Sequence, residues 1–422
     1  MDFPIHSLSR ARDVDGEAAE AYLKYLDIRA AFLIGRFRKH PDFPGVHTGY
    51  NSITGIEFAE EDNLPYGWIN GRGVSAFCRF ADAFPHAKDE LMAFAGHTVS
   101  WLEKHLALND GHIPFLAERS GMEKQTQCPC PKGYKSYSDL YGALAFVEYG
   151  ARVQDKRLVA LGVNLFDQAI DALKANRFVP EPDPIFEDRL FENPYSIALD
   201  TANDFYKLLG DARYLQMAAD LTEHLLDAHY AEEAGAFVEF ASLDGKPLRG
   251  ENGDYIVDPG HSVEFCSFAL EFARLAVQAG QFGSLAERIR RLAPKLLLWN
   301  VEKGWNRKHP GMFKSFEAVS GQPVNRTMPW WILPETMLGL LLGYECTKEE
   351  LFLEKYVDAH NAYFGMYMNE KTNFGPFQNI DGDTGLPVDI VPACKFQDPE
   401  FHAGKNILTC TQVMERIGLG AL

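Results

Sequence analysis

The 422-residue chain lacks the features of a membrane or nucleic-acid-binding protein. No apolar run approaches the roughly 20 residues needed to span a bilayer, and the opening MDFPIHSLSRARDVDGE has no hydrophobic signal core. Positive charge is scarce, because 41 Lys and Arg stand against 59 Asp and Glu, a net charge of −18. Such a chain is repelled by nucleic acid and by anionic membrane surfaces, and it disfavours anionic substrates. A cytoplasmic location is expected.

Cysteine is also sparse. The seven cysteines, an odd number scattered along the chain, do not have the spacing of a disulfide framework. The close pair Cys128 and Cys130 has no second pair at zinc-site spacing, so reduced loop cysteines and no metal are expected. The Asp381-Gly382-Asp383 stretch predicts a hairpin turn, since the other oxygens of a calcium loop are missing. There is no P-loop, GxGxxG, HExxH or GxSxG motif, and no cofactor is expected.

Helical periodicity is abundant. Apolar residues recurring at three and four positions predict about twelve helices. Their ranges are 17–38, 68–85, 88–106, 136–153, 157–175, 195–209, 212–230, 262–279, 282–299, 334–345, 347–363 and 404–418. Even helices are joined to the next odd helix by a few residues, such as Gly210-Asp211 or Gly280-Gln281. Odd-to-even connections run to roughly 20 to 40 residues, long enough to carry structure or function.

The long connections share a pattern of a glycine, an alternating apolar stretch and a glycine-containing turn, which predicts short β-hairpins. The five examples are GVHTGYNSITG from Gly45, GHIPFLAERSG from Gly111, GAFVEFASLDG from Gly235, GMFKSFEAVSG from Gly311 and FGPFQNIDGDTG from Phe374. They begin about 63 to 76 residues apart, with one gap about twice as long. Six helical hairpins of this kind predict an all-α fold, a single (α/α)6 barrel domain over residues 1–422. The alternative is an open array of stacked helical hairpins.

If the even helices form the inner layer, their N-termini lie under the long loops, where chemically suggestive residues recur. These are Trp68, Arg72, Tyr137, Asp139, Asn193, Pro194, His261, Glu264, Trp330, Trp331, Glu335, His402 and Lys405. Several have structural alternatives: Asp139 and Glu335 suit helix dipoles, Asn193 suits a cap, and the two tryptophans suit the core. An inward-facing histidine is more often structural than catalytic, but two at inner-helix N-termini favour an active site.

The stretch DPGHSVEFCSFALEFARLA, residues 258–276, makes the case for the first histidine. Its second half has the apolar face of a buried helix. Counting back four residues from Phe265 places His261 on that inward face, and Glu264 lies about one turn further along. A histidine and a carboxylate facing the core therefore predict a catalytic centre.

At this point the sequence resembles the N-acylglucosamine 2-epimerase family, which includes cellobiose 2-epimerases and mannose-type aldose-ketose isomerases. The resemblance runs over nearly the whole chain, and four motifs carry it. They are PGHSVEF from Pro259, WINGR ending at Arg72, WWILPE ending at Glu335 and FHAGK from Phe401. Two positions depart from the family pattern. Ile197 stands where a histidine is common, which puts the substrate in doubt, and Lys405 replaces an arginine, which keeps the charge without the bidentate fork.

The resemblance implies that a pyranose opens to its aldehyde and a proton moves at C2. Histidine suits that step because its unperturbed pKa is about 6.5, and His261 and His402 would act on opposite faces. Arg72 would stabilise the anionic enediolate, and Glu264 would orient the first histidine and help ring opening. The expected substrate-binding residues are Trp68, Tyr137, Asn193, Trp331, Glu335 and Lys405, with the two tryptophans offering flat faces to the sugar. Neither a metal nor a cofactor is implied.

Two rival functions remain at this stage. Glu264 and Glu335 could form the carboxylate pair of a glycoside hydrolase, although that reaction leaves both histidines unexplained. A sugar-binding protein that kept the fold and lost the chemistry is the other, encouraged by Ile197 and Lys405. In each case the partner is a small-molecule sugar, and a homodimer is left open.

Overall fold

The computed structural model describes residues 3–124, 129–390 and 394–419, so Cys128 of the predicted reduced pair lies outside the described residues. The chain divides into two compact units. The first unit contains Met1–Leu26, Phe186–Pro392 and Asn406–Leu422, and the second contains Asp27–Ile185 and Ala393–Lys405. The single domain over residues 1–422 stays a prediction. Among the described residues, no helix combines the length and apolarity that crossing a bilayer requires.

The second unit is built of helical hairpins. Its helices are the part of α1 (Gly16–Lys39) from Asp27 on, α2 (Gly67–Ala83), α3 (Lys88–Leu108), α4 (Tyr137–Arg152) and α5 (Lys156–Lys174), with the short 3-10 helices η2 (Glu60–Asp62) and η3 (Pro85–Ala87). Helix α2 packs on α3, α4 packs on α5, and the two even helices pack on each other. The paired strands β1 (Lys135–Ser136) and β2 (Phe178–Val179) are parallel and lie before α4 and after α5.

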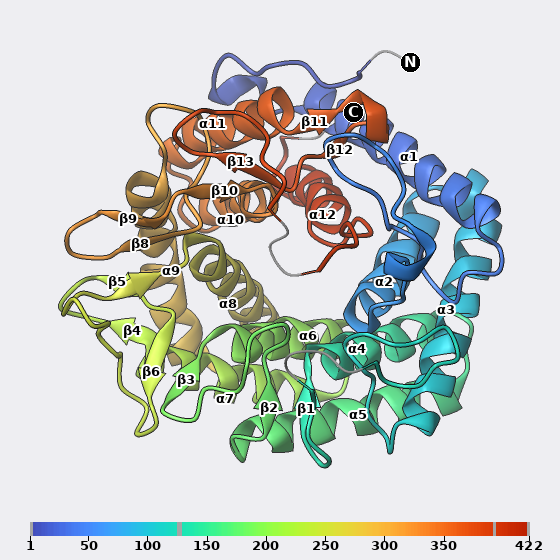
Figure 1. Ribbon diagram of the computed structural model, residues 1–422. Coiled ribbons are helices and arrows are strands. Elements are labelled where there is room, and N and C mark those ends of the chain that lie inside the picture. Colours follow the sequence, from blue (N-terminus) through green and yellow to red (C-terminus); the bar gives the residue numbers. More distant parts are fainter. Residues whose placement is uncertain (1–2, 125–128, 391–393, 420–422) are drawn as a thin grey trace. The chain divides into compact units, whose positions relative to one another are not determined.

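The first unit repeats the same plan. Its helices are α6 (Asn193–Leu209), α7 (Ala212–His229), α8 (Pro259–Ala279), α9 (Gly283–Gly304), α10 (Ile332–Thr347), α11 (Leu351–Met366) and the part of α12 (Ala403–Arg416) from Asn406 on, with η1 (Ala11–Asp13) and η4 (Glu370–Thr372). Each even helix from α6 to α10 packs on the odd helix that follows it, and α8 also packs on both α6 and α10 (Figure 1). The alternation of short and long connections predicted this pairing.

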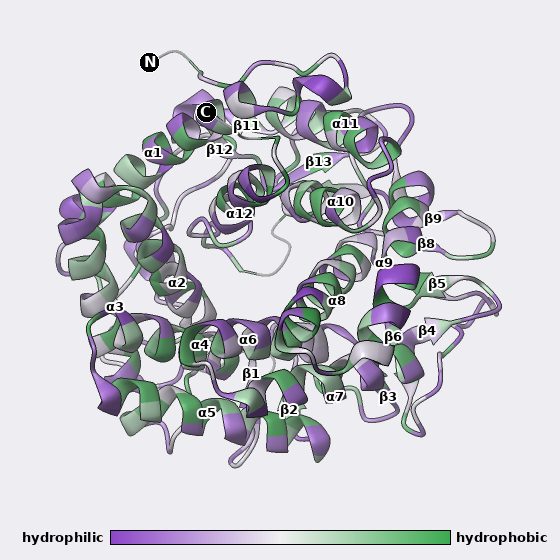
Figure 2. Cartoon of the chain, turned by 180° about the vertical axis from the view of Figure 1, so that it is seen from behind, coloured by the Kyte–Doolittle hydropathy of each residue, from purple (hydrophilic) through white to green (hydrophobic). Residues whose placement is uncertain are grey.

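Burial separates the even helices from the odd ones, as the predicted inner and outer layers require. In α4, 13 of 16 residues are buried, against 8 of 19 in α5. In α8, 15 of 21 are buried, against 10 of 22 in α9. A helix that is covered around most of its circumference is an interior helix, whereas an amphipathic one faces solvent. Figure 2 shows hydrophobic and hydrophilic residues on different sides of α5.

Most predicted helix boundaries lie within three residues of the observed ones. A larger difference is at α9, which continues to Gly304 rather than ending near residue 299, and at α11, which begins at Leu351 rather than near 347. Helix α8 begins at Pro259, three residues earlier than the apolar pattern predicts. The reason is a capping signal outside that pattern: Asp258 caps the helix and proline occupies its first position.

The long connections contain short strands, as predicted. In the first unit these are β3 (Arg189–Phe191), β4 (Tyr230–Ala231), β5 (Ala236–Phe237), β6 (Phe240–Ser242), β7 (Ile256–Val257), β8 (Ser315–Glu317), β9 (Pro323–Asn325), β10 (Thr327–Pro329), β11 (Met368–Asn369), β12 (Gly375–Pro376) and β13 (Asn379–Asp381). Consecutive strands pair as antiparallel hairpins in three places: β4 with β5, β8 with β9 and β11 with β12. Other strands find partners outside their own stretch: β6 pairs with β3, and β13 pairs with β10.

The strands of two connections, between α7 and α8 and between α9 and α10, enclose a small core of their own. Its buried residues are Ala231, Ala236, Val238, Tyr255, Val257, Phe316 and Ala318, with Trp299 of α9 packed against them. This loop core matters for function because Glu239 directly follows Val238 and Asp258 directly follows Val257. Side chains at these positions start from a fixed backbone.

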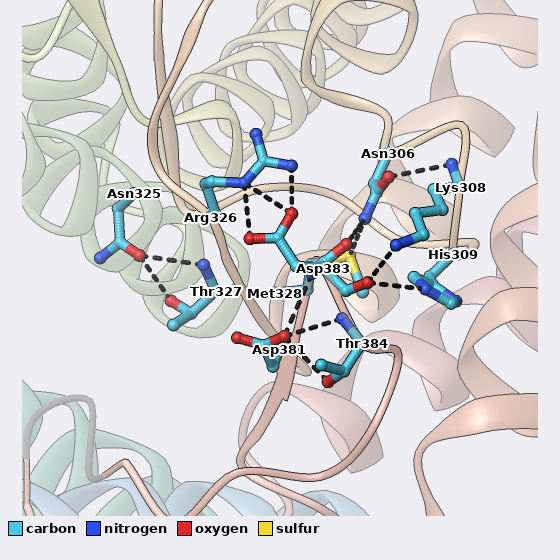
Figure 3. Close-up of polar contacts among 11 residues, drawn as sticks. Asn306, Lys308, His309, Asn325, Arg326, Thr327, Met328, Asp381, Asp383 and Thr384 are labelled. Carbon is cyan, nitrogen blue, oxygen red and sulfur yellow. Dashed lines mark hydrogen bonds and ion pairs between the residues drawn. The ribbon is translucent and has the colours of Figure 1, made fainter.

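Polar contacts join the connection between α9 and α10 to the connection between α11 and α12 (Figure 3). Asn306, which is buried, donates from Nδ2 to the Gly382 carbonyl oxygen at 2.7 Å. Arg326 forms an exposed ion pair with Asp383, and Asp381 accepts from the Thr384 amide at 2.8 Å. The Asp381 stretch is therefore the hairpin turn that the sequence predicts.

Candidate active site

The first turn of α8 places His261. Asp258 accepts hydrogen bonds from the backbone amides of Gly260 and His261 at 2.9 and 3.4 Å, which satisfies N–H groups that have no partner within the helix. A Cβ at Gly260 would lie 2.4 Å from the indole of Trp331. Glycine at this position therefore lets the indole pack against the start of the helix, beside the histidine.

Three carboxylates surround Nδ1 of His261. Oε1 of Glu239 lies 2.9 Å away, at hydrogen-bond distance. Oε1 of Glu192 and Oδ2 of Asp258 each lie 3.6 Å away. All three carboxylates are buried. The sequence argument expected Glu264 to orient this imidazole, but the contact to Nδ1 comes from Glu239.

The backbone ties these carboxylates together. The Glu239 amide donates to the Ile256 carbonyl oxygen at 3.0 Å, and the Glu239 carbonyl accepts from the Glu192 amide at 3.1 Å. Glu192 stands just before α6, and its Oε2 accepts from the Ser196 hydroxyl at 2.7 Å. Segments from two connections, before α6 and before α8, thus converge on one imidazole.

The charge balance keeps His261 protonated. Burial alone would lower its pKa, but the negative charges of Asp258 and Glu239 outweigh burial and raise the pKa to about 10. Burial raises the pKa of Glu192 to about 8. The Lys314 ammonium forms an ion pair with Asp258, and with His261 it holds the pKa of that carboxyl low despite burial. At neutral pH the site contains an imidazolium.

Aromatic rings enclose the imidazole. Trp331 stacks on it with ring centroids 5.5 Å apart and an interplanar angle of 29°. Phe191 meets it edge-on at 5.9 Å. Lys314 lies 5.2 Å from the Trp331 ring centroid, a cation–π contact. The structure therefore gives Trp331 a role against His261, and its predicted contact with the sugar stays a prediction.

Two more predicted residues meet in the first unit. Asn193 donates from Nδ2 to Oε2 of Glu264 at 3.3 Å, and both side chains are buried. Ile197, one turn further along α6, is buried as well. Glu335 lies in the first turn of α10 and is 3% exposed. The first unit thus carries His261, Glu264, Asn193, Trp331 and Glu335 of the predicted site.

In the second unit, Arg72 lies within a cage of rings. Its guanidinium carbon is 4.8 Å from the Trp68 ring centroid, 4.4 Å from that of Tyr141 and 5.3 Å from that of Phe401. Nη2 donates to the Tyr141 hydroxyl at 2.7 Å, and Nη1 lies 3.8 Å from Oδ1 of Asp398. These contacts fix the orientation of a buried cation.

Asp398 also organises the segment that leads into α12. Its Oδ2 accepts from the backbone amides of Phe401 and His402 at 2.7 and 3.1 Å. Burial raises the pKa of Asp398, although the charges of His402 and Arg72 oppose the shift. Nζ of Lys405 lies 4.6 Å from the Phe401 ring centroid. The second unit therefore brings Arg72, His402 and Lys405 into one cluster.

The remaining predicted residues of the second unit open α4. Tyr137 is 4% exposed, with its ring centroid 6.3 Å from that of Trp68. Asp139 has the structural role that was its alternative: it forms a capping box with Ser136 and accepts from Nδ1 of His112 at 2.7 Å. The predicted contact of Tyr137 with the sugar stays a prediction.

His261 belongs to the first unit and His402 to the second, so their placement across one cavity stays a prediction. Sequence reasoning missed Glu192, Glu239, Asp258, Lys314 and Asp398. The Asp-Pro-Gly order was a usable signal for the cap at 258, and Glu192 directly precedes a predicted site residue. Nothing in the local pattern marks Glu239 or Lys314, which the loop core brings to the histidine.

The carboxylates around His261, together with its imidazole, offer donor atoms for a divalent cation. Ligand atoms of Glu192, Glu239 and His261 lie within 4.8 Å of one another. Carboxylate oxygens and an imidazole nitrogen are ligands for transition metals. The 2.9 Å separation between Nδ1 and Oε1 of Glu239 equally fits a shared proton.

Comparison with known proteins points to one family. The family model described as N-acylglucosamine 2-epimerase (GlcNAc 2-epimerase) matches residues 67–397. The N-acylglucosamine 2-epimerase of Mus musculus is 23% identical over 384 residues, which cover 87% of this chain and 86% of the mouse protein.

Solved structures agree with the predicted fold. A cellobiose 2-epimerase from Bacillus thermoamylovorans B4167 matches with a TM-score of 0.70 at 15% identity, covering 91% of this chain and 99% of that protein. A D-mannose isomerase matches with a TM-score of 0.71 at 15% identity, covering 94% and 97%. Likeness at such identity establishes the fold, and it confirms the predicted (α/α)6 barrel.

Proposed function

The chain belongs to the N-acylglucosamine 2-epimerase family, and on that premise we propose that it acts on a neutral reducing sugar at C2, giving the epimer or the ketose. The observation that carries the chemistry is the 2.9 Å contact between Nδ1 of His261, at the start of α8, and Oε1 of Glu239. The first unit buries the carboxylates of Glu239, Asp258, Glu264 and Glu335, whereas the raised pKa of about 8 keeps Glu192 largely neutral at pH 7. The excess of these carboxylates over the cations of His261 and Lys314, together with the net charge of −18, supports a neutral substrate rather than a phosphorylated or carboxylated one.

In the proposed reaction the sugar first opens to its aldehyde. His402 removes the proton from C2, and the electron pair of the C2–H bond passes to the carbonyl, which gives an enediolate. Arg72 stabilises this anion electrostatically. His261, which begins the cycle protonated, returns a proton to the opposite face of C2 and leaves the inverted configuration. Delivery to C1 instead, with the O2 hydroxyl proton passing to O1, gives the ketose.

The proposal extends the role that the sequence suggested for His261. A general base must be unprotonated, whereas the surroundings of His261 favour its cation. His261 is therefore assigned as the proton donor in this direction, and the two histidines exchange roles in the reverse direction. Glu264 is left to contact the substrate together with Asn193, to which it is hydrogen bonded.

The test is solvent exchange at C2. Neutral aldoses, N-acylated amino sugars and reducing disaccharides are incubated with the protein in heavy water, and deuterium at C2 is followed by NMR. The wild type is expected to label at least one sugar. His261→Asn and His402→Asn should each reduce exchange by about 10² to 10⁴, the usual contribution of a general acid or base.

Two outcomes would replace this proposal. Glycosidic bond cleavage that survives both histidine substitutions without C2 exchange assigns a hydrolase, with Glu264 and Glu335 as its carboxylates. Sugar binding without exchange by the wild type assigns a binding protein that has lost the chemistry.

A further inference from the structure

The contact between Glu239 and His261 differs from the other acidic contacts at this imidazole. Asp258 caps α8 and pairs with Lys314, so its oxygens already have partners. Glu192 directs Oε2 to Ser196 and keeps Oε1 3.6 Å from Nδ1. Glu239 alone among the three lies at hydrogen-bond distance, 2.9 Å. The orientation of the imidazole is thus determined mainly by one carboxylate.

We propose that Glu239 is the positioning residue of the proton-transfer centre: it accepts the Nδ1–H of His261 and so presents Nε2–H as the atom that donates the proton to the sugar carbon. The inference rests on the proposed function, and it assigns a residue that lies outside the motifs shared with the family. Glu239 acts through His261 and does not itself take part in the reaction.

The surroundings give Glu239 the rigidity that such a role needs. Val238, which precedes it, is 1% exposed and belongs to the loop core. The backbone amide of Glu239 donates to the Ile256 carbonyl oxygen, and the Glu239 carbonyl oxygen accepts from the Glu192 amide. A carboxylate on a backbone fixed at both of its polar groups has little freedom to leave the histidine.

Aromatic packing completes the arrangement. An imidazole can rotate by half a turn and exchange its two nitrogens. Trp331 stacked against the ring and Phe191 at its edge restrict that motion, and the bond to Glu239 favours one of the two orientations. A fixed tautomer and ring orientation are what an acid–base histidine requires from its partner.

The charged groups that face His261 come from every segment packed against it. They are Glu192 before α6, Glu239 after β5, Asp258 at the start of α8 and Lys314 before β8, and Glu264 of α8 acts on Lys314. The ammonium of Lys314 lowers the pKa of His261, whereas Asp258 and Glu239 raise it. Removing the charge of Glu239 alone should therefore lower the pKa while the other groups stay in place.

The test compares Glu239→Gln, Glu239→Asp and the exposed control Glu251→Gln in the full-length protein. The side chain of His261 is followed by NMR with ¹⁵N-labelled histidine, and His261→Asn assigns its signals. In the wild type and the control, the imidazole should stay protonated with Nδ1 bonded above pH 8. In Glu239→Gln, the titration should move at least one pH unit lower.

Catalysis provides the second readout. Glu239→Gln should lower kcat at least tenfold with KM changed less than twofold, and the pH profile of kcat should move in the same direction as the NMR titration. Glu239→Asp keeps the negative charge but carries it on a shorter side chain, farther from the imidazole. Its kcat should therefore lie between those of Glu239→Gln and the wild type. A purely structural role would lower stability in both variants without moving the titration of His261.

Three results would overturn the proposal. The first is a titration of His261 that is the same in Glu239→Gln as in the wild type. The second is a wild-type His261 spectrum that changes on dialysis against EDTA and returns with Zn²⁺ or Mn²⁺, since Nδ1 would then bind a metal. The third is a Glu239→Gln variant with unchanged kcat. If the wild type incorporates deuterium at C2 of none of the sugars, the proposed function fails. The NMR titration of His261 still decides the role of Glu239 in that case.

Discussion

At the scale of single residues, Gly260 sets how closely Trp331 can approach α8. Gly260→Ala places a methyl group 2.4 Å from the indole, so the ring has to move away from His261. We expect a loss of about 1–3 kcal/mol in the free energy of unfolding, as in other overpacked sites, and reduced C2 exchange. Urea unfolding followed by far-UV circular dichroism measures the first effect.

The matched control is Gly283→Ala at the start of α9, where a Cβ meets nothing within 4 Å. It should leave stability unchanged or raise it by a few tenths of a kcal/mol, because alanine reduces the entropy of the unfolded chain. Equal stability of the two variants would contradict the close packing of Trp331.

Among the site residues, the sequence predicted those that stand in motifs and missed those that stand in loops. Helical periodicity predicted His261 and Glu264 on the inward side of one helix, and both belong to the first two turns of α8, where Glu264 is buried. Glu239 and Lys314 could not be predicted, because they reach the histidine only through the pairing of β7 with β8 and the loop core beneath them. Such contacts depend on tertiary packing, which single-sequence patterns do not encode.

At the scale of elements, the start of α8 combines a helix cap with an ion pair. Asp258→Ala removes the cap, worth about 1 kcal/mol, and also the carboxylate that pairs with Lys314. Asp258→Asn keeps a good capping side chain and removes only the charge. We therefore expect the alanine variant to be less stable than the asparagine variant in urea, and both to show reduced C2 exchange.

Asp155 at the start of α5 provides the comparison. It accepts from the amides of Arg157 and Leu158 at 2.9 and 3.2 Å, and it lies outside the site. Asp155→Ala should also cost about 1 kcal/mol but leave C2 exchange at the wild-type rate. Loss of exchange in Asp155→Ala would show that helix capping alone, and not the charge at 258, explains the Asp258 variants.

The contacts between two connections in Figure 3 separate buried from exposed polar interactions. Asn306→Ala removes the bond to the Gly382 carbonyl in a buried setting, and we expect a loss of about 1–3 kcal/mol. Arg326→Ala removes an exposed ion pair and should hardly change the urea midpoint. A larger effect for Arg326→Ala than for Asn306→Ala would contradict this ordering.

The helices were predictable because apolar residues recur in each of them at spacings of three and four residues. Turn residues mark many of their ends. The strands were predictable as short extended stretches, but most of their partners were not. The stretch from Gly235, for example, was expected to pair with itself, yet β5 pairs with β4 and β6 with β3. Pairing between distant connections is decided by the packing of the helices that carry them.

At the scale of the whole molecule, buried histidines predict acid sensitivity. Burial lowers the pKa of His229 and His47 to about 3, and that of His105 and His360 to about 4. The unfolded chain binds these protons near pH 6.5 and the folded chain does not. The contribution of these four histidines to stability is therefore full above about pH 6.5 and falls as the pH drops toward 4.

Thermal unfolding between pH 7 and 4.5 measures this fall. His229→Gln should flatten the slope of Tm against pH, whereas replacement of the exposed His86 by Gln should not. His261 does not disturb the comparison. Because its folded pKa is raised, its contribution is full below pH 6.5 and is lost only as the pH rises toward 10. An unchanged slope in His229→Gln would contradict the prediction.

The fold and the broad activity were within reach of the sequence. The repeat of long and short connections predicted the (α/α)6 barrel, which the solved structures confirm. The predicted class, a carbohydrate epimerase and hence an isomerase, is confirmed by the family match. The substrate could not be predicted, because Ile197 stands where the resemblance implies a histidine in contact with a sugar hydroxyl.

The loops of the first unit do not act as independent modules. Glu192, Glu239, Asp258, Lys314 and Trp331 come from three successive long connections, and all of them contact one another or His261. An engineer who grafts one of these connections from a relative, in search of a new specificity, would also alter the acidity of the first histidine. The three connections have to be exchanged together.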